Sequence, residues 1–327
     1  MAGLALFLTG MLVFRIWEEG RPRSEPAARE EVDQTPADGI YYDHAWYVPR
    51  KDIQTMLLLG IDKYAEAGGR QDVQGEYEQA DFLLLLVTDP RTHTCTAIHL
   101  NRDTMTDIRM ISDAGTLLGM YTGQLTLAHA YGLDSKMRCQ NTVRAVSDLL
   151  YGVRIDHYLS LAMDGVSALN DLAGGVTVEI MEDFSKVDPS LLKGETVTLK
   201  GDQALAYVRR RLDIGDGSNL SRMKRQEQYL EALQEKLLEM SENDSGFINS
   251  ALLEVNEYMV SDCTVNQLSA FSEMLREYGI SEYRMLEGEA VEGEDHVEFY
   301  ADEDALRELV VSLFYEPMEE TKENGDG

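Results

Sequence analysis

The sequence predicts an α/β protein. Three apolar runs have the length and composition of strands that are buried on both faces, and they span residues 55–61, 82–87 and 94–100. The clearest amphipathic helix spans residues 219–240 and repeats leucine and methionine at helical spacing, with Ser218 or Asn219 as its cap. A chain of 327 residues that combines such strands and helices forms one large α/β domain or two ordinary ones.

Each of the three apolar runs is flanked by a charged residue that could bind an ion or take part in catalysis. Asp62 follows the first run, Asp81 precedes the second, and Arg102 and Asp103 come just after the third. The turn at residues 89–92 joins the second and third runs so closely that we expect them to be antiparallel neighbours. The charged residues are therefore expected at the ends of adjacent strands.

The remaining elements are expected from shorter patterns. Helical spacing marks residues 125–131, 141–150 and 202–208, and a strand is expected at residues 177–180. Residues 156–173 alternate apolar patches with polar residues and end at a pair of glycines, and the α/β pattern then continues to about Tyr315.

Both ends of the chain differ from this body. Met1 to Phe14 carry no charge, and a helix of that length spans about 21 Å, less than the ~30 Å hydrocarbon core of a bilayer. We interpret residues 1–17 as part of a transmembrane anchor whose first turns are missing from this chain; a signal-peptide core and a buried helix are the alternatives. The proline-bearing residues 18–46 are interpreted as a linker, residues 47–315 as the folded domain, and residues 316–327 as an acidic disordered tail.

The net charge and the cysteine content limit the classes of function that fit this chain. The chain has 29 Lys+Arg against 59 Asp+Glu, a net charge of -30, which argues against nucleic acid as a partner because phosphate-backbone binding needs a basic face. Cys95, Cys139 and Cys263 show neither a CxxC pair nor zinc spacing. A disulfide between two of them outside the cell and unpaired buried thiols both remain open.

Arginines gather on one helix of this acidic chain. Arg222 lies three residues before Arg225 and four before Gln226, so the three side chains share a face of the helix. They occupy its first two turns, where free N–H groups and the helix dipole favour an anion. Because the apolar stripe lies opposite, we expect them to point away from the core. A solvated basic face is the alternative to an anion site.

A second group of arginines, Arg209 to Arg211, follows the short helix at residues 202–208. Arg209 and Arg211 point the same way if the helix has ended and the chain is extended, whereas in a helix they diverge by about 200°. Guanidinium groups present planar forks of donors that match phosphate oxygens, so these residues and Arg102 predict a pyrophosphate site.

Asp62 and Asp81 are candidate ligands of a hard cation such as Mg²⁺, because carboxylates at adjacent strand ends are able to converge on one ion. The alternative is that each aspartate caps a loop. His129 and His157 are interpreted as packing residues rather than metal ligands. No paired Cys/His or Ser/His nucleophile, GxSxG or P-loop pattern is present in the sequence.

Taken in order, eight motifs resemble those of the LytR-CpsA-Psr family of cell-envelope phosphotransferases, over roughly residues 55–240. The resemblance implies one domain with a central mixed β-sheet flanked by helices, after an N-terminal membrane anchor. The motifs are LLLGID at 57–62, ADFLLLLV at 80–87, LNRDT at 100–104, AHAYG at 128–132, DHY at 156–158, NDLAGGV at 170–176, LKGDQALAYVRRR at 199–211 and SRMKRQ at 221–226.

The resemblance implies a single-pass membrane protein with an extracytoplasmic catalytic domain. Such enzymes transfer a glycopolymer, as a sugar-1-phosphate, from an undecaprenyl-pyrophosphate carrier to a peptidoglycan hydroxyl. A polyprenyl-pyrophosphate hydrolase and a non-catalytic lipid-glycan binder are the alternatives. The resemblance also implies roles for single residues. The cation, Mg²⁺ or Mn²⁺, is held by Asp62 and Asp81, and the catalytic carboxylate is Asp103. The pyrophosphate is bound by Arg102, Arg209 and Arg211, and the site is lined by Arg222, Arg225, Gln226 and Gln79.

The sequence departs from the family pattern at two places. Gln79 and Ala80 stand where the family usually has Arg-Ser or Arg-Thr, which removes one expected pyrophosphate contact. Residues 213–221 also differ in detail from the commonest form. The first departure concerns affinity for the carrier more than the type of reaction.

Overall fold

The computed structural model describes residues 38–62 and 78–318, apart from residues 212, 245 and 295. A compact unit begins at Ile40. The predicted anchor, most of the predicted linker, residues 63–77 and most of the predicted acidic tail lie outside the described residues. Across the described part of the chain, we find no helix with the length and apolar character needed to cross a bilayer.

The folded unit extends beyond the boundaries expected from the sequence at both ends. Strand β1 (Ile40–Tyr42) and the start of β2 (Ala45–Pro49) fall within the predicted linker, and β15 (Tyr315–Pro317) enters the predicted tail. β2 pairs with both β1 and β15 in an antiparallel sheet. β15 was not expected because its pairing with β2 joins segments about 270 residues apart, which no local pattern reveals.

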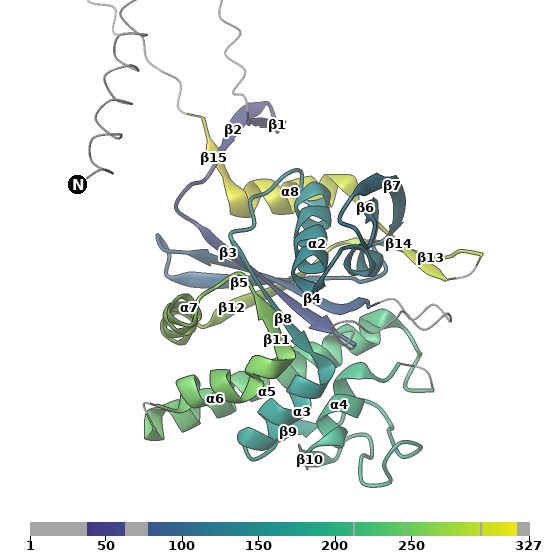
Figure 1. Cartoon of the computed structure of the whole chain (residues 1–327), viewed down its shortest axis with the longest axis vertical. Coiled ribbons are helices and arrows are strands. Elements are labelled where there is room, and N and C mark those ends of the chain that lie inside the picture. Colours follow the sequence, from purple (N-terminus) through teal and green to yellow (C-terminus); the bar gives the residue numbers. More distant parts are fainter. Residues whose placement is uncertain (1–37, 63–77, 212, 245, 295, 319–327) are drawn as a thin grey trace, which may run out of the picture. The chain divides into compact units, whose positions relative to one another are not determined.

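A six-stranded mixed sheet forms the centre of the molecule (Figure 1). β3 runs antiparallel to β4, and β4 antiparallel to β5, as expected from the short turn. β8 and β12 add on either side in parallel to β3 and β5. The strand order is β11 (Met259–Ser261), β8 (His157–Ala162), β3 (Gln54–Ile61), β4 (Ala80–Asp89), β5 (Thr94–Leu100) and β12 (Ile280–Met285).

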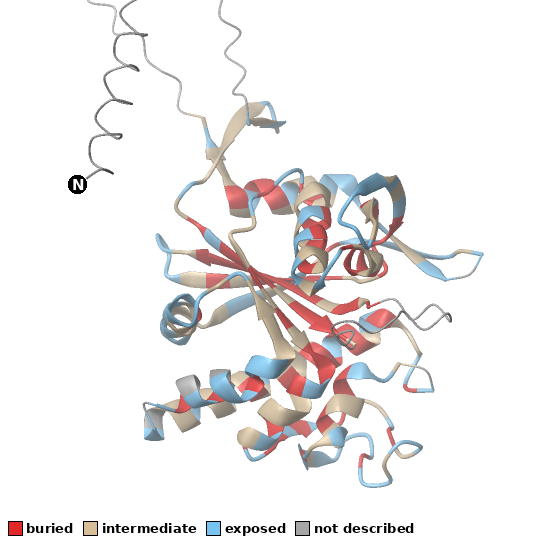
Figure 2. Ribbon diagram, in the orientation of Figure 1, coloured by how far each residue is buried: buried red, intermediate tan, exposed pale blue. Residues whose placement is uncertain are grey.

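Helices cover both faces of this sheet, so its central strands are almost fully buried (Figure 2). Leu57 and Leu85 point into the larger core, which α2 (Ser135–Leu149) and α8 (Glu303–Phe314) close. Leu84 and Leu86 point to the other face, towards α5 (Asn219–Asn243) and α7 (Val265–Tyr278). The α/β class with a central mixed sheet and flanking helices is thereby confirmed.

The remaining elements surround this framework. A separate hydrophobic core joins α5 to α3 (Met163–Leu172), α4 (Asp202–Arg209) and the β9–β10 hairpin. The hairpins and short segments are β6 (Met105–Ile111) with β7 (Leu117–Gln124), η1 (Leu125–Ala130), β9 (Val176–Glu179) with β10 (Thr196–Leu199), α6 (Phe247–Val255), η2 (Asn256–Tyr258) and β13 (Gly288–Glu292) with β14 (Val297–Ala301).

A bulge shapes the edge of the sheet where β3 ends and β4 begins. Gly60 pairs with Phe82, but Ile61 pairs with Ala80, so Asp81 is the extra residue between them. A Cβ at Gly60 would lie 2.9 Å from the Cβ of Phe82, so only glycine fits this approach. The bulge brings Asp62 and Asp81 to the same edge, beside the end of β5.

Candidate functional site

Charged side chains from five segments meet at this edge of the sheet. Asp62 follows β3, Asp81 lies at the start of β4, and Arg102 and Asp103 follow β5. The remaining members come from the end of α4 and the first turn of α5, and they are Arg209, Arg211 and Arg222. We call these seven residues the arginine–aspartate cluster.

Arg102 is held at the start of β4. Its guanidinium group donates to Asp81 and, through Nη2, to Oε1 of Gln79 at 2.8 Å, while Nε lies 3.4 Å from Oδ1 of Asp103. Gln79, which replaces an expected arginine, therefore contacts the cluster as an acceptor for Arg102. Compared with the expected arginine, Gln79 brings no positive charge of its own but accepts a hydrogen bond that holds the charged side chain of Arg102.

The end of α4 directs two arginines into the cluster. The helix ends at Arg209 and the next residue, Arg210, is extended, so Arg209 and Arg211 both reach the sheet edge. Nη2 of Arg209 donates to Oδ2 of Asp62 at 2.9 Å, and Nε of Arg209 lies 2.9 Å from Oδ1 of the same carboxylate. Nη1 of Arg211 lies 3.6 Å from Oδ2 of Asp103. The sequence left open whether Arg209 and Arg211 point the same way; in the structure each pairs with a different carboxylate of the cluster.

Arg222 closes the cluster from the first turn of α5. Its Nη2 donates to Oδ1 of Asn219 at 2.6 Å, and its Nη1 lies 3.9 Å from Oδ2 of Asp81. Only 5% of its side chain is exposed, and Nε has no hydrogen-bond partner among the described residues. A buried guanidinium group with an unused donor is a site for an anion.

Arg225 and Gln226, in contrast, do not line the site. Nη1 and Nη2 of Arg225 donate to the carbonyl oxygens of Tyr207 and Arg210, and Nε2 of Gln226 donates to that of Val208. The expectation that these side chains point away from the core is wrong, because the last carbonyls of α4 need donors and α5 supplies them. Both residues act on the site indirectly, by fixing the segment that carries Arg209 and Arg211.

Arg225 is the more deeply buried of the two anchors. Its side chain is 1% exposed, its Nε lies 2.9 Å from Oε2 of Glu182, and its guanidinium carbon lies 4.9 Å from the ring centre of Phe184. An ion pair, two carbonyl acceptors and an aromatic face thus satisfy the charge without any ligand.

The cluster holds more positive than negative charge. Four guanidinium groups face three carboxylates, although the whole chain carries a net charge of -30. Burial lowers the pKa of Arg222 to about 10, and repulsion by Arg211 adds to this effect. The pKa of Arg102 is lowered to about 10 by burial and by repulsion from Arg222. An anion would relieve both costs, since it favours the charged forms.

Asp103 is a buried carboxylate that contacts two arginines of the cluster and is hydrogen-bonded to Gln124 and Asn101. It is 3% exposed; its Oδ1 accepts from Nε2 of Gln124 at 3.0 Å, and its backbone N–H donates to Oδ1 of Asn101 at 2.9 Å. Asp103 is therefore the carboxylate of the cluster that lies next to both Arg102 and Arg211. Its catalytic role stays a prediction.

Three polar residues of the site were not identified from the sequence. Oδ1 of Asn101 accepts from Nδ2 of Asn219 at 2.6 Å, which ties the end of β5 to the start of α5, and Gln124 supports Asp103. Asn101 stands beside Arg102 in the LNRDT motif and Asn219 was expected only as a helix cap. Gln124 had no local signal, because it reaches the site only through the β6–β7 hairpin.

The carboxylates fit a hard divalent cation. Asp62 and Asp81 supply oxygen ligands only, at adjacent strand ends, and no thiol or imidazole lies in the cluster. Each carboxylate is paired with a guanidinium group: Asp62 with Arg209, and Asp81 with Arg222. A divalent cation would take over the neutralisation of these carboxylates, and the arginines would then be available to an anion. Asp62 and Asp81 are the residues that would hold Mg²⁺ or Mn²⁺.

The two histidines considered from the sequence differ in their surroundings. His129 is fully buried, with Nδ1 3.2 Å from Oγ1 of Thr142 and Nε2 3.7 Å from Oε2 of Glu78, so it packs as expected. Burial lowers the pKa of His129 to about 3, and repulsion by Arg138 contributes. His157 lies beside Asp262 and outside the arginine–aspartate cluster. All three cysteines are unpaired in the structure.

Known proteins resemble this chain in sequence and in fold. The polyisoprenyl-teichoic acid–peptidoglycan teichoic acid transferase TagU of Halalkalibacterium halodurans is 31% identical over 191 residues, which are 58% of this chain and 55% of the relative. The chain thus spans about half the length of that relative. The crystal structure of Bacillus subtilis TagV matches with a TM-score of 0.61 at 22% identity, covering 81% of this chain and 96% of TagV.

A structure of TagT bound to LI-WTA matches with a TM-score of 0.60 at 22% identity, over 80% of this chain and 90% of TagT. These structural similarities concern the fold. The family model of the LytR_cpsA_psr family matches residues 23–310, which include every residue of the arginine–aspartate cluster. On this match over most of its length, the chain belongs to the LytR_cpsA_psr family.

Proposed function

We propose that this protein transfers a glycopolymer, as a sugar-1-phosphate, from an undecaprenyl-pyrophosphate carrier to a hydroxyl of peptidoglycan. The observation that supports this most directly is the arginine–aspartate cluster, whose buried Arg222 keeps an unused donor in a chain that is otherwise strongly acidic. The names of the TagU and TagT matches, which refer to polyisoprenyl-linked teichoic acid and to LI-WTA, agree with such a donor.

The proposed reaction forms one phosphodiester bond and breaks one bond of the pyrophosphate. The acceptor oxygen attacks the phosphorus that bears the sugar, the oxygen between the two phosphorus atoms leaves with undecaprenyl phosphate, and the hydroxyl proton passes to a base. Arg102, Arg209, Arg211 and Arg222 neutralise the phosphate oxygens as charge shifts to the leaving group. A Mg²⁺ or Mn²⁺ ion held by Asp62 and Asp81 would supply further charge neutralisation.

Asp103 is the proposed base for the acceptor proton. It is the carboxylate of the cluster that is most deeply buried, and two arginines lie within 3.6 Å of its oxygens. In this proposal the protein is held at the outer face of the cell membrane by a single N-terminal anchor, where both the lipid carrier and peptidoglycan are available.

The first test is Arg102→Ala with Arg144→Ala as the matched control. Arg102 contacts Asp81 and Gln79 inside the cluster, whereas Arg144 is an exposed arginine on α2 that pairs with Asp148. Loss of a charge-assisted contact to the reacting phosphates costs about 100-fold or more in rate. We therefore expect Arg102→Ala to remove nearly all transfer and Arg144→Ala to retain it.

Transfer is measured with the full chain, a polyprenyl-pyrophosphate-linked glycan, a peptidoglycan oligomer and Mg²⁺, by following glycan bound to the acceptor and release of polyprenyl phosphate. Free glycan phosphate formed in the presence of acceptor would instead identify a hydrolase. Tight binding of the carrier without turnover would identify a lipid-glycan binder. Full transfer by Arg102→Ala, with circular dichroism showing both variants folded, would refute the site.

A further inference from the structure

Three metal-ligating side chains meet at the opposite edge of the central sheet. His157 begins β8, and Asp262 and Cys263 follow β11, the antiparallel neighbour of β8. One ligand atom from each lies within 4.8 Å of the others. His157 pairs with Met56 near the start of β3, whereas Asp62 follows the end of that strand, so about 20 Å separates the group from the arginine–aspartate cluster.

The spacing of these atoms matches a zinc-type site. Nδ1 of His157 lies 3.6 Å from Oδ1 of Asp262, and Sγ of Cys263 lies 3.8 Å from the same oxygen. In a tetrahedral zinc site with bonds of about 2.0 Å to nitrogen and oxygen and about 2.3 Å to sulfur, neighbouring ligand atoms lie about 3.3–3.6 Å apart. Two of the three separations thus lie within a few tenths of an ångström of this range, and all three atoms lie within 4.8 Å of one another.

His157 has an unused ring nitrogen that points to this group. Nδ1 is buried from solvent and has no hydrogen-bond partner in the part of the chain that the structure describes. The packing role expected from the sequence does not explain why a polar atom is buried in this way beside a carboxylate and a thiol. A bound ion would satisfy it.

The two other ligands lie in a turn that is fixed at both ends. Oγ of Ser261 donates to the carbonyl oxygen of Tyr158 at 2.6 Å and accepts from the N–H of Cys263 at 3.0 Å. The N–H of Tyr158 donates to Oδ1 of Asp262 at 3.0 Å. Thr264, the next residue, caps α7 in a capping box. The ligands are thus held in place before any ion binds, as structural metal sites require.

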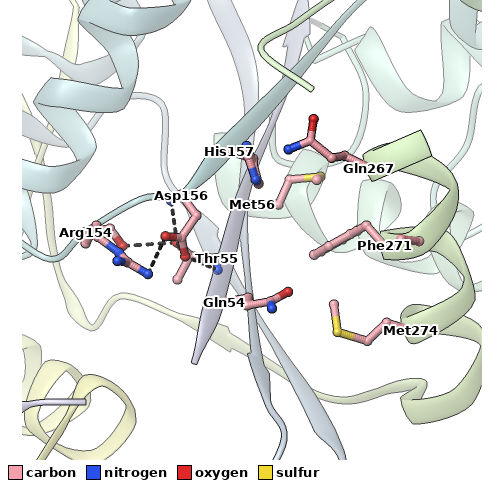
Figure 3. A pocket seen from close by; sticks show the side chains of 10 residues that line it. Gln54, Thr55, Met56, Arg154, Asp156, His157, Gln267, Phe271 and Met274 are labelled. Atoms are coloured by element: carbon pink, nitrogen blue, oxygen red, sulfur yellow. Dashed lines mark hydrogen bonds and ion pairs between the residues drawn. The ribbon is translucent and has the colours of Figure 1, made fainter. Parts of the chain in front are cut away.

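A cavity of about 370 Å³ is lined by His157 but by neither Asp262 nor Cys263. Figure 3 shows His157 and Met56 facing Gln267, Phe271 and Met274 of α7 across this cavity. The side chains of His157 and Asp262 are partly exposed, and three protein ligands that solvent reaches are typical of sites in which water completes the coordination.

We propose that His157, Asp262 and Cys263 bind one Zn²⁺-like ion, with a water molecule as the fourth ligand. Thiolate and imidazole ligands select borderline ions such as Zn²⁺ or Co²⁺, whereas Mg²⁺ selects oxygen ligands. The ion would join β8 to β11 and the start of α7, so it stabilises the fold independently of the arginine–aspartate cluster.

Co²⁺ is the probe for this site, because a thiolate bound to Co²⁺ gives a charge-transfer band that oxygen ligands do not give. With the reduced full chain we expect one equivalent of Co²⁺ to produce this band and Zn²⁺ to displace it. The band should be lost in Cys263→Ser and in His157→Ala. The control His296→Ala removes a histidine that lies 3.8 Å from Glu298, a pair that the structure places near no cysteine, and it should keep the band.

Thermal unfolding gives a second readout that does not depend on transfer activity. A slight excess of Zn²⁺ should raise the melting temperature of the wild-type protein, EDTA should reverse the rise, and Cys263→Ser should show none. A wild-type protein without the band, or a band that survives in Cys263→Ser, would overturn the proposal. Because Cys95 and Cys139 are buried, they do not account for a surviving band in the folded protein.

Discussion

Arg222 and Arg225 lie three residues apart on α5, yet they have different roles. Arg222 faces the cluster. Nε of each arginine lacks a hydrogen-bond partner among the described residues, but Nε of Arg225 lies 2.9 Å from Oε2 of Glu182, and its other nitrogens donate to the carbonyls of Tyr207 and Arg210. Spacing alone groups the two residues on one helix face. It does not show that the end of α4 packs against part of that face, and this contact decides which arginine is available to a ligand.

Methionine at each position separates the two roles. Arg225→Met leaves Glu182 unpaired and two carbonyls without donors, so the free energy of unfolding should fall by about 3–5 kcal/mol. Arg222→Met removes a charge that burial and Arg211 disfavour, so stability should be kept or raised, whereas affinity for a polyprenyl pyrophosphate should fall at least about tenfold. Urea unfolding and calorimetric titration measure the two effects, and equal losses of stability would contradict these assignments.

His129 makes the stability of the fold depend on pH. Its folded pKa is about 3 and its ordinary value is 6.5, so between these values the unfolded chain binds a proton that the folded chain excludes. Stability is therefore unaffected by this group above about pH 6.5 and is lost as the pH falls towards 3, by at most about 1.4 kcal/mol per pH unit.

His129→Gln tests this dependence, because glutamine does not titrate and is able to bond to Thr142. The fall in unfolding free energy between pH 7 and pH 5 should be smaller in the variant than in the wild-type protein. His93→Gln is the control, since His93 is an exposed histidine beside Glu277. Identical pH profiles for wild type and His129→Gln would show that His129 is protonated without cost.

At the scale of elements, long apolar runs were predictable and paired short strands were not. β3, β4 and β5 begin and end within one or two residues of the expected bounds, because strands buried on both faces need uninterrupted apolar sequence. The β6–β7 and β13–β14 hairpins were not expected, because half-exposed strands carry mixed sequences. Arg102 follows the recognised end of β5, whereas the sequence left open where α4 ends, and the structure ends it at Arg209.

The bulge between β3 and β4 is the element that aligns the two candidate cation ligands. Gly60→Ala places a Cβ 2.9 Å from that of Phe82 and 3.4 Å from the methyl carbon of Met163, so the strands must move apart next to Asp62 and Asp81. We expect a loss of stability of about 1–3 kcal/mol from overpacking, and a lower apparent affinity for Mg²⁺ in the transfer reaction.

Gly246→Ala is a suitable control for this substitution. Gly246 precedes α6 with an ordinary φ of -89°, and a Cβ there meets only the carboxylate oxygen of Asp244, at 3.3 Å. Unfolding in urea and the Mg²⁺ dependence of transfer are the measurements. If Gly60→Ala keeps both values of the wild-type protein, the bulge does not position the carboxylates.

At the scale of the whole molecule, the arginine–aspartate cluster is a small positive region in a strongly acidic protein. Short-range contacts determine binding in the cluster, because a net charge of -30 repels a polyanionic ligand at longer range. The other edge of the sheet carries ion pairs of a different kind, in which Arg50 bridges Asp52 and Asp89. The two edges therefore differ in how their charges are paired.

The same net charge predicts that salt stabilises this protein. At pH 7 the carboxylates outnumber the basic groups about twofold, and the repulsion among them acts over about 30 Å at 0.01 M salt but over only about 8 Å at 0.15 M. Exposed ion pairs such as Arg276–Glu273 lose little when screened, because each contributes at most about 1 kcal/mol. The melting temperature at pH 7 should therefore rise with NaCl, as measured by calorimetry.

Near the isoelectric point of about 4.4 the net repulsion vanishes, so the rise of the melting temperature with NaCl should disappear or reverse. A melting temperature that falls with salt at pH 7 would show instead that ion pairs outweigh the repulsion.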